Sequence, residues 1–137
     1  MKHPRFSAVA AAVDGRVIVC SGWKGGPGGG TLHHTVECLD TVSCIWEELQ
    51  PIPTWRHRAV AVGHKNCVYV LGGNNMTTVE CYDVEAQAWS SMPQLEFIPT
   101  AAGVIDGKLI ALRRARTVFT ACFDFPERKW EVLRGAY

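Results

Sequence analysis

Four potential metal ligands lie close together in the first third of the sequence. His33, His34, Cys38 and Cys44 fall within twelve residues, and imidazole and thiolate groups are the ligands that zinc prefers. A structural zinc site, however, combines two pairs of such ligands at short, regular spacings. No second pair accompanies this cluster, so we expect neither a metal nor a cofactor.

The cysteines are spread along the chain, at Cys20, Cys38, Cys44, Cys67, Cys81 and Cys122. An even number permits three disulfides, but the spacing shows no Cys-x-x-Cys pair and no compact framework. We expect reduced thiols that pack as small hydrophobic side chains in a cytoplasmic protein. Exposure of Cys44 and Cys67 would leave a redox-sensing role open for these two thiols.

Groups suited to catalysis are poorly placed. Asp40, Asp83 and Asp124 recur at equivalent points of a repeat, where an aspartate typically accepts the backbone N–H bonds of a turn. The glycine-rich stretch 25–30 lacks the following helix and the Lys-Ser/Thr ending of a phosphate-binding loop. It is typical of a long flexible loop, and loops on a rigid scaffold often carry binding residues. We therefore expect a binding protein and no enzyme.

One short segment has the composition of a binding site. Trp55-Arg56-His57-Arg58 places an aromatic ring and two guanidinium groups together, as the hot spots of protein interfaces do. A guanidinium group can hold a carboxylate through two hydrogen bonds. Arg5 occupies the position in the preceding repeat that matches Arg56. Two plainer interpretations stay open: one arginine pairs with an acid of a neighbouring repeat, and Trp55 serves only packing.

Charge and hydropathy narrow the class of protein. The chain has 137 residues, of which 47% are hydrophobic, and 14 Lys and Arg oppose 13 Asp and Glu for a net charge of +1. This balance argues against binding to nucleic acid or to anionic membranes, and against disorder. The longest apolar run near the N-terminus, Ala8 to Val13, is too short for a membrane span.

A repeat organises the chain. Trp46, Trp89 and Trp130 are 43 and 41 residues apart. Seven residues before each tryptophan stands another hydrophobic residue, with a cysteine before it and an aspartate after it. Self-similarity at a period of roughly 40–50 residues indicates a propeller or a solenoid.

The second repeat shows the elements best. Apolar or alternating runs predict four strands, at 59–62, 68–71, 79–83 and 89–92, and no segment keeps a helical period. Asp-Gly pairs in the repeats on either side predict tight hairpins. Four-stranded sheets with two apolar faces bury them by stacking around an axis, as the blades of a propeller do. We expect the tryptophans to fill the gaps between blades and small residues in the first strands to suit the narrow axis.

This pattern resembles the kelch repeat, which has an apolar strand, a Gly-Gly pair, an aromatic residue and then a tryptophan. The positions that carry it are Gly72, Gly73, Tyr82 and Trp89 in the second repeat, Gly22, Leu39 and Trp46 in the first, and Phe123 and Trp130 in the third. Arg113 and Arg114 replace the glycine pair of the third repeat. Because arginine does not adopt positive φ cheaply, we expect the chain to bend differently there.

The resemblance implies an all-β fold, a partial kelch β-propeller of three four-stranded antiparallel blades with essentially no helix. We expect one kelch-repeat region over 1–137, with blades at about 5–52, 56–95 and 99–134. Closed propellers have roughly four to eight blades. Three repeats therefore describe either an open piece of a six-bladed propeller, cut by truncation or splicing, or half of a ring that a homodimer completes.

The resemblance also implies a protein–protein interaction module. Kelch propellers bind partner peptides, often acidic ones, with the loops that join second and third strands and with the loops between blades. The residues carried over to those loops are Arg5, Trp55, Arg56, His57, Arg58, Asn74, Asn75, Arg113, Arg114 and Arg116. The run 113–116 is equally compatible with a plain solvated loop.

Many kelch propellers follow BTB and BACK domains and select substrates for a cullin-3 ubiquitin ligase. We expect this role if the chain is a fragment or truncated form of such a protein, since it has no such helical domains itself. An actin or cytoskeletal scaffold is the alternative. A propeller enzyme fits less well, because the copper-binding oxidases of similar fold use Tyr and His, whereas Tyr69 and Tyr82 occupy repeat positions and the histidines are scattered.

Overall fold

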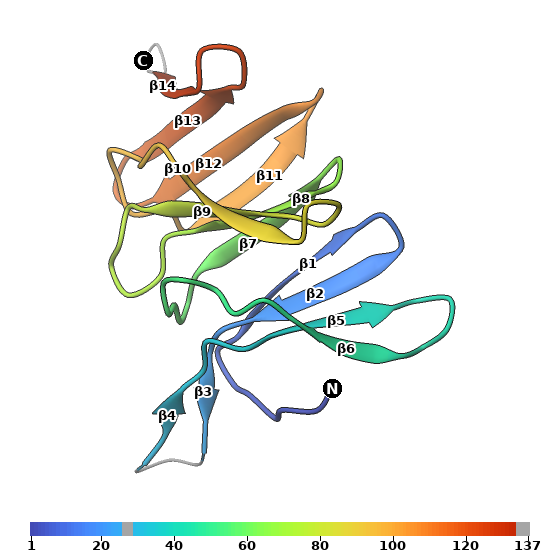
Figure 1. Ribbon diagram of the computed structural model, residues 1–137. Helices are drawn as coiled ribbons and strands as arrows, with labels where there is room; N and C mark the ends of the chain where they lie inside the picture. Colours follow the sequence, from blue (N-terminus) through green and yellow to red (C-terminus); the bar gives the residue numbers. More distant parts are fainter. Residues whose placement is uncertain (26–28, 134–137) are drawn as a thin grey trace.

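Three sheets of four strands follow one another along the chain (Figure 1). The computed structural model describes residues 1–25 and 29–133. Within these ranges every regular element is a strand, which confirms the all-β expectation. The described residues contain no helix with the length and apolar character that crossing a membrane requires.

Each four-stranded sheet is antiparallel and forms one blade. Blade 1 contains β1 (Val9–Val13), β2 (Arg16–Cys20), β5 (Val36–Asp40) and β6 (Trp46–Leu49). Blade 2 contains β7 (Val60–His64), β8 (Cys67–Leu71), β9 (Val79–Asp83) and β10 (Ala88–Met92). Blade 3 contains β11 (Ala101–Ile105), β12 (Lys108–Arg114), β13 (Val118–Asp124) and β14 (Lys129–Leu133). The predicted repeat of four strands is therefore confirmed.

Blade 1 carries an additional two-stranded ribbon in the connection between β2 and β5. β3 (Trp23–Lys24) pairs with β4 (Thr31–Leu32), and the ribbon projects from the sheet in Figure 1. Backbone hydrogen bonds in both directions between Phe6 and Trp23 hold its base. The glycine-rich stretch 25–30, predicted as a loop, lies between these two strands, and its described residues Gly25, Gly29 and Gly30 belong to no strand. Residues 26–28 of the glycine-rich stretch lie outside the described residues.

The turns follow the sequence closely. Asp14 and Gly15 have φ of 46° and 69°, and Asp106 and Gly107 have φ of 49° and 73°, as a two-residue hairpin with positive φ at both positions requires. The turn after the third strand of each blade is held by an aspartate that accepts backbone N–H bonds two or three residues later. These predicted turn aspartates are Asp40, Asp83 and Asp124.

The first strands of the three blades lie next to one another. β7 contacts β1 on one side and β11 on the other. The backbones approach closely at Gly63, where an added Cβ would lie 2.0 Å from the carbonyl oxygen of Ala12. Small residues in these strands make this approach possible, as expected for strands next to a narrow axis.

Tryptophans join neighbouring blades. Trp89 packs against the core between blades 1 and 2, and its Nε1–H donates to the carbonyl oxygen of Gln50 at 2.9 Å. Trp130 packs against the core between blades 2 and 3, and its Nε1–H donates to the carbonyl oxygen of Pro93 at 2.9 Å. The predicted role of tryptophan at the junctions is confirmed for Trp89 and Trp130, whereas Trp46 packs against neither of the cores formed by the described residues.

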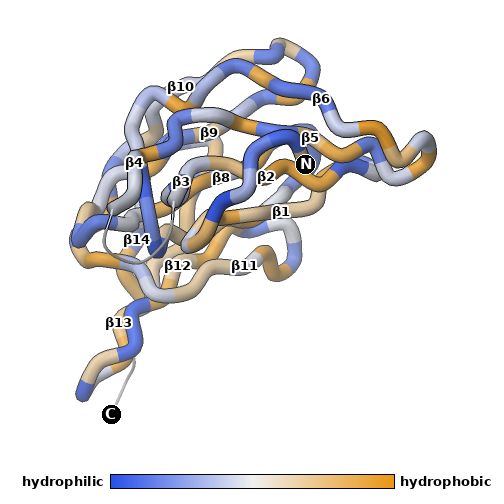
Figure 2. Tube along the Cα trace, turned by 90° about the horizontal axis from the view of Figure 1, so that it is seen from below, coloured by the Kyte–Doolittle hydropathy of each residue, from blue (hydrophilic) through white to orange (hydrophobic). Residues whose placement is uncertain are grey.

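Two apolar cores lie between the blades, one at each junction. Hydrophobic colour runs along β1 and β2 in Figure 2, and the strands that face a neighbouring sheet supply most of the buried side chains. Tyr82 and Phe123 each stand beside the tryptophan paired with them, with ring centroids 5.1 Å apart in both pairs. The repeat positions are thus the positions that hold the stack together.

Candidate partner-binding site

Blade 2 buries an arginine at the end where the longer loops gather. Arg56, which precedes β7, is 1% exposed, and its Nε–H donates to Oε2 of Glu80 at 3.0 Å. The same guanidinium donates to the carbonyl oxygens of Gly72 and Thr78 and to the Thr78 hydroxyl. These bonds satisfy a charge that burial would otherwise destabilise strongly.

Arg5 repeats this arrangement in blade 1. Its guanidinium donates to Oε2 of Glu37 at 2.8 Å and to acceptors of Ser21 and Thr35, and the two charged side chains are 1% and 0% exposed. Arg5 and Arg56 therefore lie beneath the surface. The expectation that these two arginines belong to the partner-binding loops as contact residues is therefore corrected, because both form buried ion pairs. Each arginine pairs with an acid of its own blade rather than with an acid of a neighbouring blade.

Glu37 is ionised inside this network. Burial works to raise the pKa of its carboxyl group, but hydrogen bonds from the Lys2 backbone N–H, the Arg5 guanidinium and the His3 backbone N–H hold that pKa below its usual range. The N-terminal segment thus closes over the carboxylate and stabilises its charged form.

In blade 3, apolar side chains stand at the positions that match the Arg56–Glu80 ion pair of blade 2. The strand pairing of blade 2 recurs in blade 3 with a constant shift of 41 residues, the distance from Trp89 to Trp130. By this shift, Phe97, Phe119 and Ala121 stand where blade 2 has its arginine, threonine and glutamate. Phe97 and Ala121 are buried, and the rings of Phe97 and Phe119 lie 6.2 Å apart.

The glycine turn is also missing from blade 3. Gly72 and Gly73 have φ of 66° and 82°, whereas Arg113 and Arg114 continue β12 and pair with the start of β13. β12 and β13 are consequently seven residues long, two more than β8 and β9. The expected difference in bending is confirmed, because the chain runs straight where blade 2 turns.

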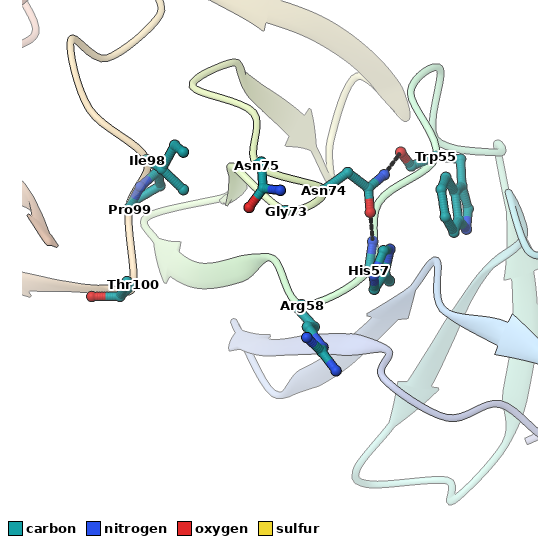
Figure 3. Close-up of a pocket in the computed structure, with 9 residues that line it drawn as sticks. All are labelled: Trp55, His57, Arg58, Gly73, Asn74, Asn75, Ile98, Pro99 and Thr100. Atoms are coloured by element: carbon teal, nitrogen blue, oxygen red, sulfur yellow. Dashed lines mark hydrogen bonds between the residues drawn. The ribbon is translucent and has the colours of Figure 1, made fainter. Parts of the chain in front are cut away.

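A groove of about 520 Å³ lies between the loops of blades 2 and 3 (Figure 3). The predicted partner-binding residues that line it are Trp55, His57, Arg58, Asn74 and Asn75. Ile98, Pro99 and Thr100 form the opposite side in Figure 3. The sequence analysis did not predict these three as site residues. It could have found them only through their place in the repeat, in the connection between blades 2 and 3.

Asn74 and two aromatic rings hold the blade 2 side of the groove. The Asn74 amide donates to the carbonyl oxygen of Trp55 at 3.1 Å, and its side-chain oxygen accepts the backbone N–H of His57 at 3.2 Å (Figure 3). Trp55 stacks on His57, meets Trp23 edge to face, and donates its Nε1–H to the carbonyl oxygen of Gly22 at 3.0 Å. Trp55 therefore packs between blades while it also lines the groove.

Arg58 supplies the cation of the groove. Its side chain is exposed and forms no ion pair with any residue that the structure describes. Its φ is 55°, and Ser7 has φ of 52° at the matching position of blade 1, so this conformation belongs to the repeat. No aspartate or glutamate is among the described residues that line the groove, and an anionic group that enters it meets Arg58 without competition.

The predicted arginines of blade 3 lie beside the groove. Oγ1 of Thr100, a lining residue, accepts the backbone N–H of Arg114 at 3.0 Å. Arg114 and Arg116 are exposed and Arg113 is half-buried. Within the described ranges none of the three arginines is ion-paired. The hairpin therefore adds positive charge beside the groove that Arg58 lines.

Charge is divided between the two ends of the blades. In the described stretches 21–25, 29–35, 50–58, 72–78, 93–100 and 113–117 at the groove end, Glu96 is the one acid, and the cations outside an ion pair are Lys24, Arg58, Arg113, Arg114 and Arg116. The acids at the opposite end are Asp14, Asp40, Asp83, Glu85, Asp106, Asp124 and Glu127, and they outnumber the cations Arg16, Lys65, Lys108, Arg128 and Lys129. The near-neutral total of the chain conceals this separation.

The cysteines do not contribute to the groove. All six are free thiols, and burial raises the pKa of Cys20 to about 12, so its thiol is protonated at neutral pH. Cys44 is exposed and Cys67 is half-buried. Over residues 1–25 and 29–133, no three His, Cys, Asp or Glu side chains gather in a way that could hold a metal ion.

A family model described as the Kelch motif matches residues 4–53 and 56–96, which correspond to blades 1 and 2. The Kelch domain-containing protein 7A of Mus musculus is 31% identical over 49% of this chain and 9% of its own length. An F-box/kelch-repeat protein of Arabidopsis thaliana is 29% identical over 76% of this chain and 27% of its own length. The chain thus spans less than a third of these curated relatives.

Kelch repeats indicate a propeller for protein–protein interaction, and the family is generally non-enzymatic. The matched ranges end where the arginine and the glycine pair give way to Phe97 and Arg113-Arg114. The match nevertheless covers more than half of the chain, and the blades are built on the positions of that motif; the chain belongs to the kelch-repeat family.

Proposed function

We propose that this kelch region recognises an acidic segment of a partner protein in the groove between blades 2 and 3. The observation that carries the proposal is that Arg58 forms no ion pair with a described residue and that no acid is among the described residues lining its groove, at the cationic end of the blades. A guanidinium group can hold a carboxylate through two hydrogen bonds. The rings of Trp55 and His57 add a rigid surface of the kind that anchors protein interfaces.

The resemblance to adaptors that combine BTB, BACK and kelch regions supports a finer proposal, in which the recognised segment belongs to a substrate of a cullin-3 ubiquitin ligase. The free thiols support a cytoplasmic setting for this role. A scaffold for actin would instead co-sediment with actin filaments, and binding to filaments in place of acidic peptides would contradict the adaptor proposal.

The groove is tested with a fluorescent oligoglutamate peptide and fluorescence anisotropy at low and at physiological salt, with oligoglutamine as the uncharged control. We expect Arg58→Ala to weaken binding about tenfold, and because Arg58 is exposed the fold should be unaffected. Lys65→Ala, an exposed lysine at the opposite end, is the matched control and should bind as the unchanged chain does. Equal affinity of the two variants, or equal binding of oligoglutamine, would contradict the proposal.

A further inference from the structure

Thr117 stands at the exposed bend between β12 and β13. Arginines precede it by four, three and one residues, at Arg113, Arg114 and Arg116. No other serine or threonine of the sequence has an arginine three residues before it. The hairpin thus presents one hydroxyl group within a cluster of guanidinium groups that no described acid neutralises.

We propose that Thr117 is phosphorylated by an arginine-directed Ser/Thr protein kinase and that the phosphate regulates the groove. Protein kinases select substrates through charge patterns, and carboxylates of a kinase cleft can pair with guanidinium groups that precede the hydroxyl. In the reaction Oγ1 of Thr117 forms a bond with the γ-phosphorus of Mg-ATP while the bond to the β–γ bridging oxygen breaks. ADP leaves, and the hydroxyl proton passes to the catalytic base of the kinase.

The hairpin tip is free to enter a kinase cleft. β11 pairs with β12 no further than Leu112, and β14 pairs with β13 no further than Thr120 within the described part of the chain. Among the described contacts beyond these residues, the tip is held by the last two residue pairs between β12 and β13, by the bond from the Arg114 N–H to Oγ1 of Thr100 and by the Phe119 ring beside Phe97. A two-stranded end with few neighbours opens at low cost, so residues 113–117 can be bound in extended form.

Phosphorylation would change the charge beside the groove. A phosphothreonine carries a charge of about −1.5 to −2 at neutral pH and accepts strong hydrogen bonds from arginine. At Thr117 it would pair with Arg116 and with Arg114, whose backbone N–H bond to Thr100 joins β12 to the groove. The cations would then be neutralised and an acidic segment repelled. This regulatory step rests on the proposed function, whereas the modification itself does not.

The modification is tested by incubating the chain with Mg-ATP and cAMP-dependent protein kinase as the arginine-directed probe, followed by mass spectrometry. We expect one phosphate on Thr117 and none on Thr117→Val. Arg114→Ala should lower the rate at least about tenfold while Thr117 remains, because the guanidinium three residues before the hydroxyl is lost. Arg128→Ala, an exposed arginine at the opposite end, should react as the unchanged chain does. Phosphate on another residue, or equal rates for Arg114→Ala and Arg128→Ala, would overturn the site.

The regulatory step is tested on the phosphorylated chain with the same oligoglutamate peptide. Binding about tenfold weaker than that of the unmodified chain would support it, since the phosphate offsets the charge of about two arginines. Unchanged binding by phosphorylated chain would overturn regulation and leave the modification standing. Failure of the unmodified chain to bind the peptide would overturn the proposed function, whatever the kinase experiment shows.

Discussion

Blades 2 and 3 fill the same internal position with opposite chemistry. Blade 2 buries Arg56 against Glu80, and blade 3 buries Phe97 beside Ala121 at the positions reached by the shift of 41 residues. The strand pairing around the two sites is the same. The comparison indicates that the blade requires a filled position there, and that either a satisfied ion pair or an aromatic side chain can fill it.

The residue that fills this position also affects the loop between the second and third strands of the blade. The carbonyl oxygen of Gly72, in the glycine turn, accepts a hydrogen bond from Arg56 at 2.6 Å. A blade with the arginine therefore uses a turn that directs carbonyl oxygens inward. Blade 3 has no internal arginine to satisfy, so its strands continue and its outer positions are free to carry Arg113 and Arg114.

The largest effect should come from breaking the ion pair of blade 2. Glu80→Ala leaves Arg56 buried without its acid, and we expect the free energy of unfolding to fall by about 3–5 kcal/mol. Urea denaturation followed by tryptophan fluorescence measures the change. Glu96→Ala, which removes an exposed acid from the same end, is the control and should change stability by less than about 0.5 kcal/mol. Similar losses for the two variants would show that the pair does not hold the blade.

A smaller effect is expected at the turn. An added Cβ at Gly73 would lie 2.8 Å from the carbonyl oxygen of His57, at a φ of 82°, so Gly73→Ala should cost about 1–3 kcal/mol. Arg114→Ala changes the matching position in a regular strand of blade 3 and should cost less than about 0.5 kcal/mol. Thermal unfolding of both variants measures the difference, and equal melting temperatures would contradict the contrast between the two loops.

Placing the apolar residues of blade 3 at the matching positions of blade 2 should give a variant nearly as stable as the unchanged chain. The triple change Arg56→Phe, Thr78→Phe and Glu80→Ala removes both charges and supplies the aromatic pair. We expect unfolding free energy within about 1–2 kcal/mol of the unchanged chain, because hydrophobic residues can replace a buried ion pair at little cost. The same urea titration is used. A triple variant as unstable as Glu80→Ala would show that blade 3 relies on further compensations.

The smallest effect concerns pH, and it separates blade 1 from blade 3. The folded-state pKa of Glu37 is lowered, so the unfolded chain binds the proton more tightly. The stability from this ion pair is fully present above the unfolded pKa of about 4.3 and is lost as pH falls through the folded pKa below it.

Urea titrations at neutral pH and at successively lower pH measure this loss. Glu37→Gln should show a shallower decline than the unchanged chain, although it is less stable at neutral pH. Ala121, the matching residue of blade 3, has no titratable group and contributes no such decline. An identical decline in the two chains would mean that Glu37 does not titrate with folding.

Local pattern was sufficient for most of the fold. The spacing of the tryptophans, the Asp-Gly pairs and the turn aspartates are each read within a few residues, and each element formed where they predicted it. The ribbon of β3 and β4 was not predicted, because its two short strands are stabilised by pairing with each other and with Phe6 rather than by a hydrophobic pattern.

For the candidate site, the sequence predicted less than it did for the fold. The sequence by itself, through its resemblance to the kelch repeat, implied that arginines and aromatic residues gather in the loops at one end of the blades. Only the tertiary structure decided that Arg56 is buried while Arg58, two residues later, is free to bind. The partners that bury Arg56 lie 16 to 24 residues away, and burial depends on such distant contacts, which no local pattern records.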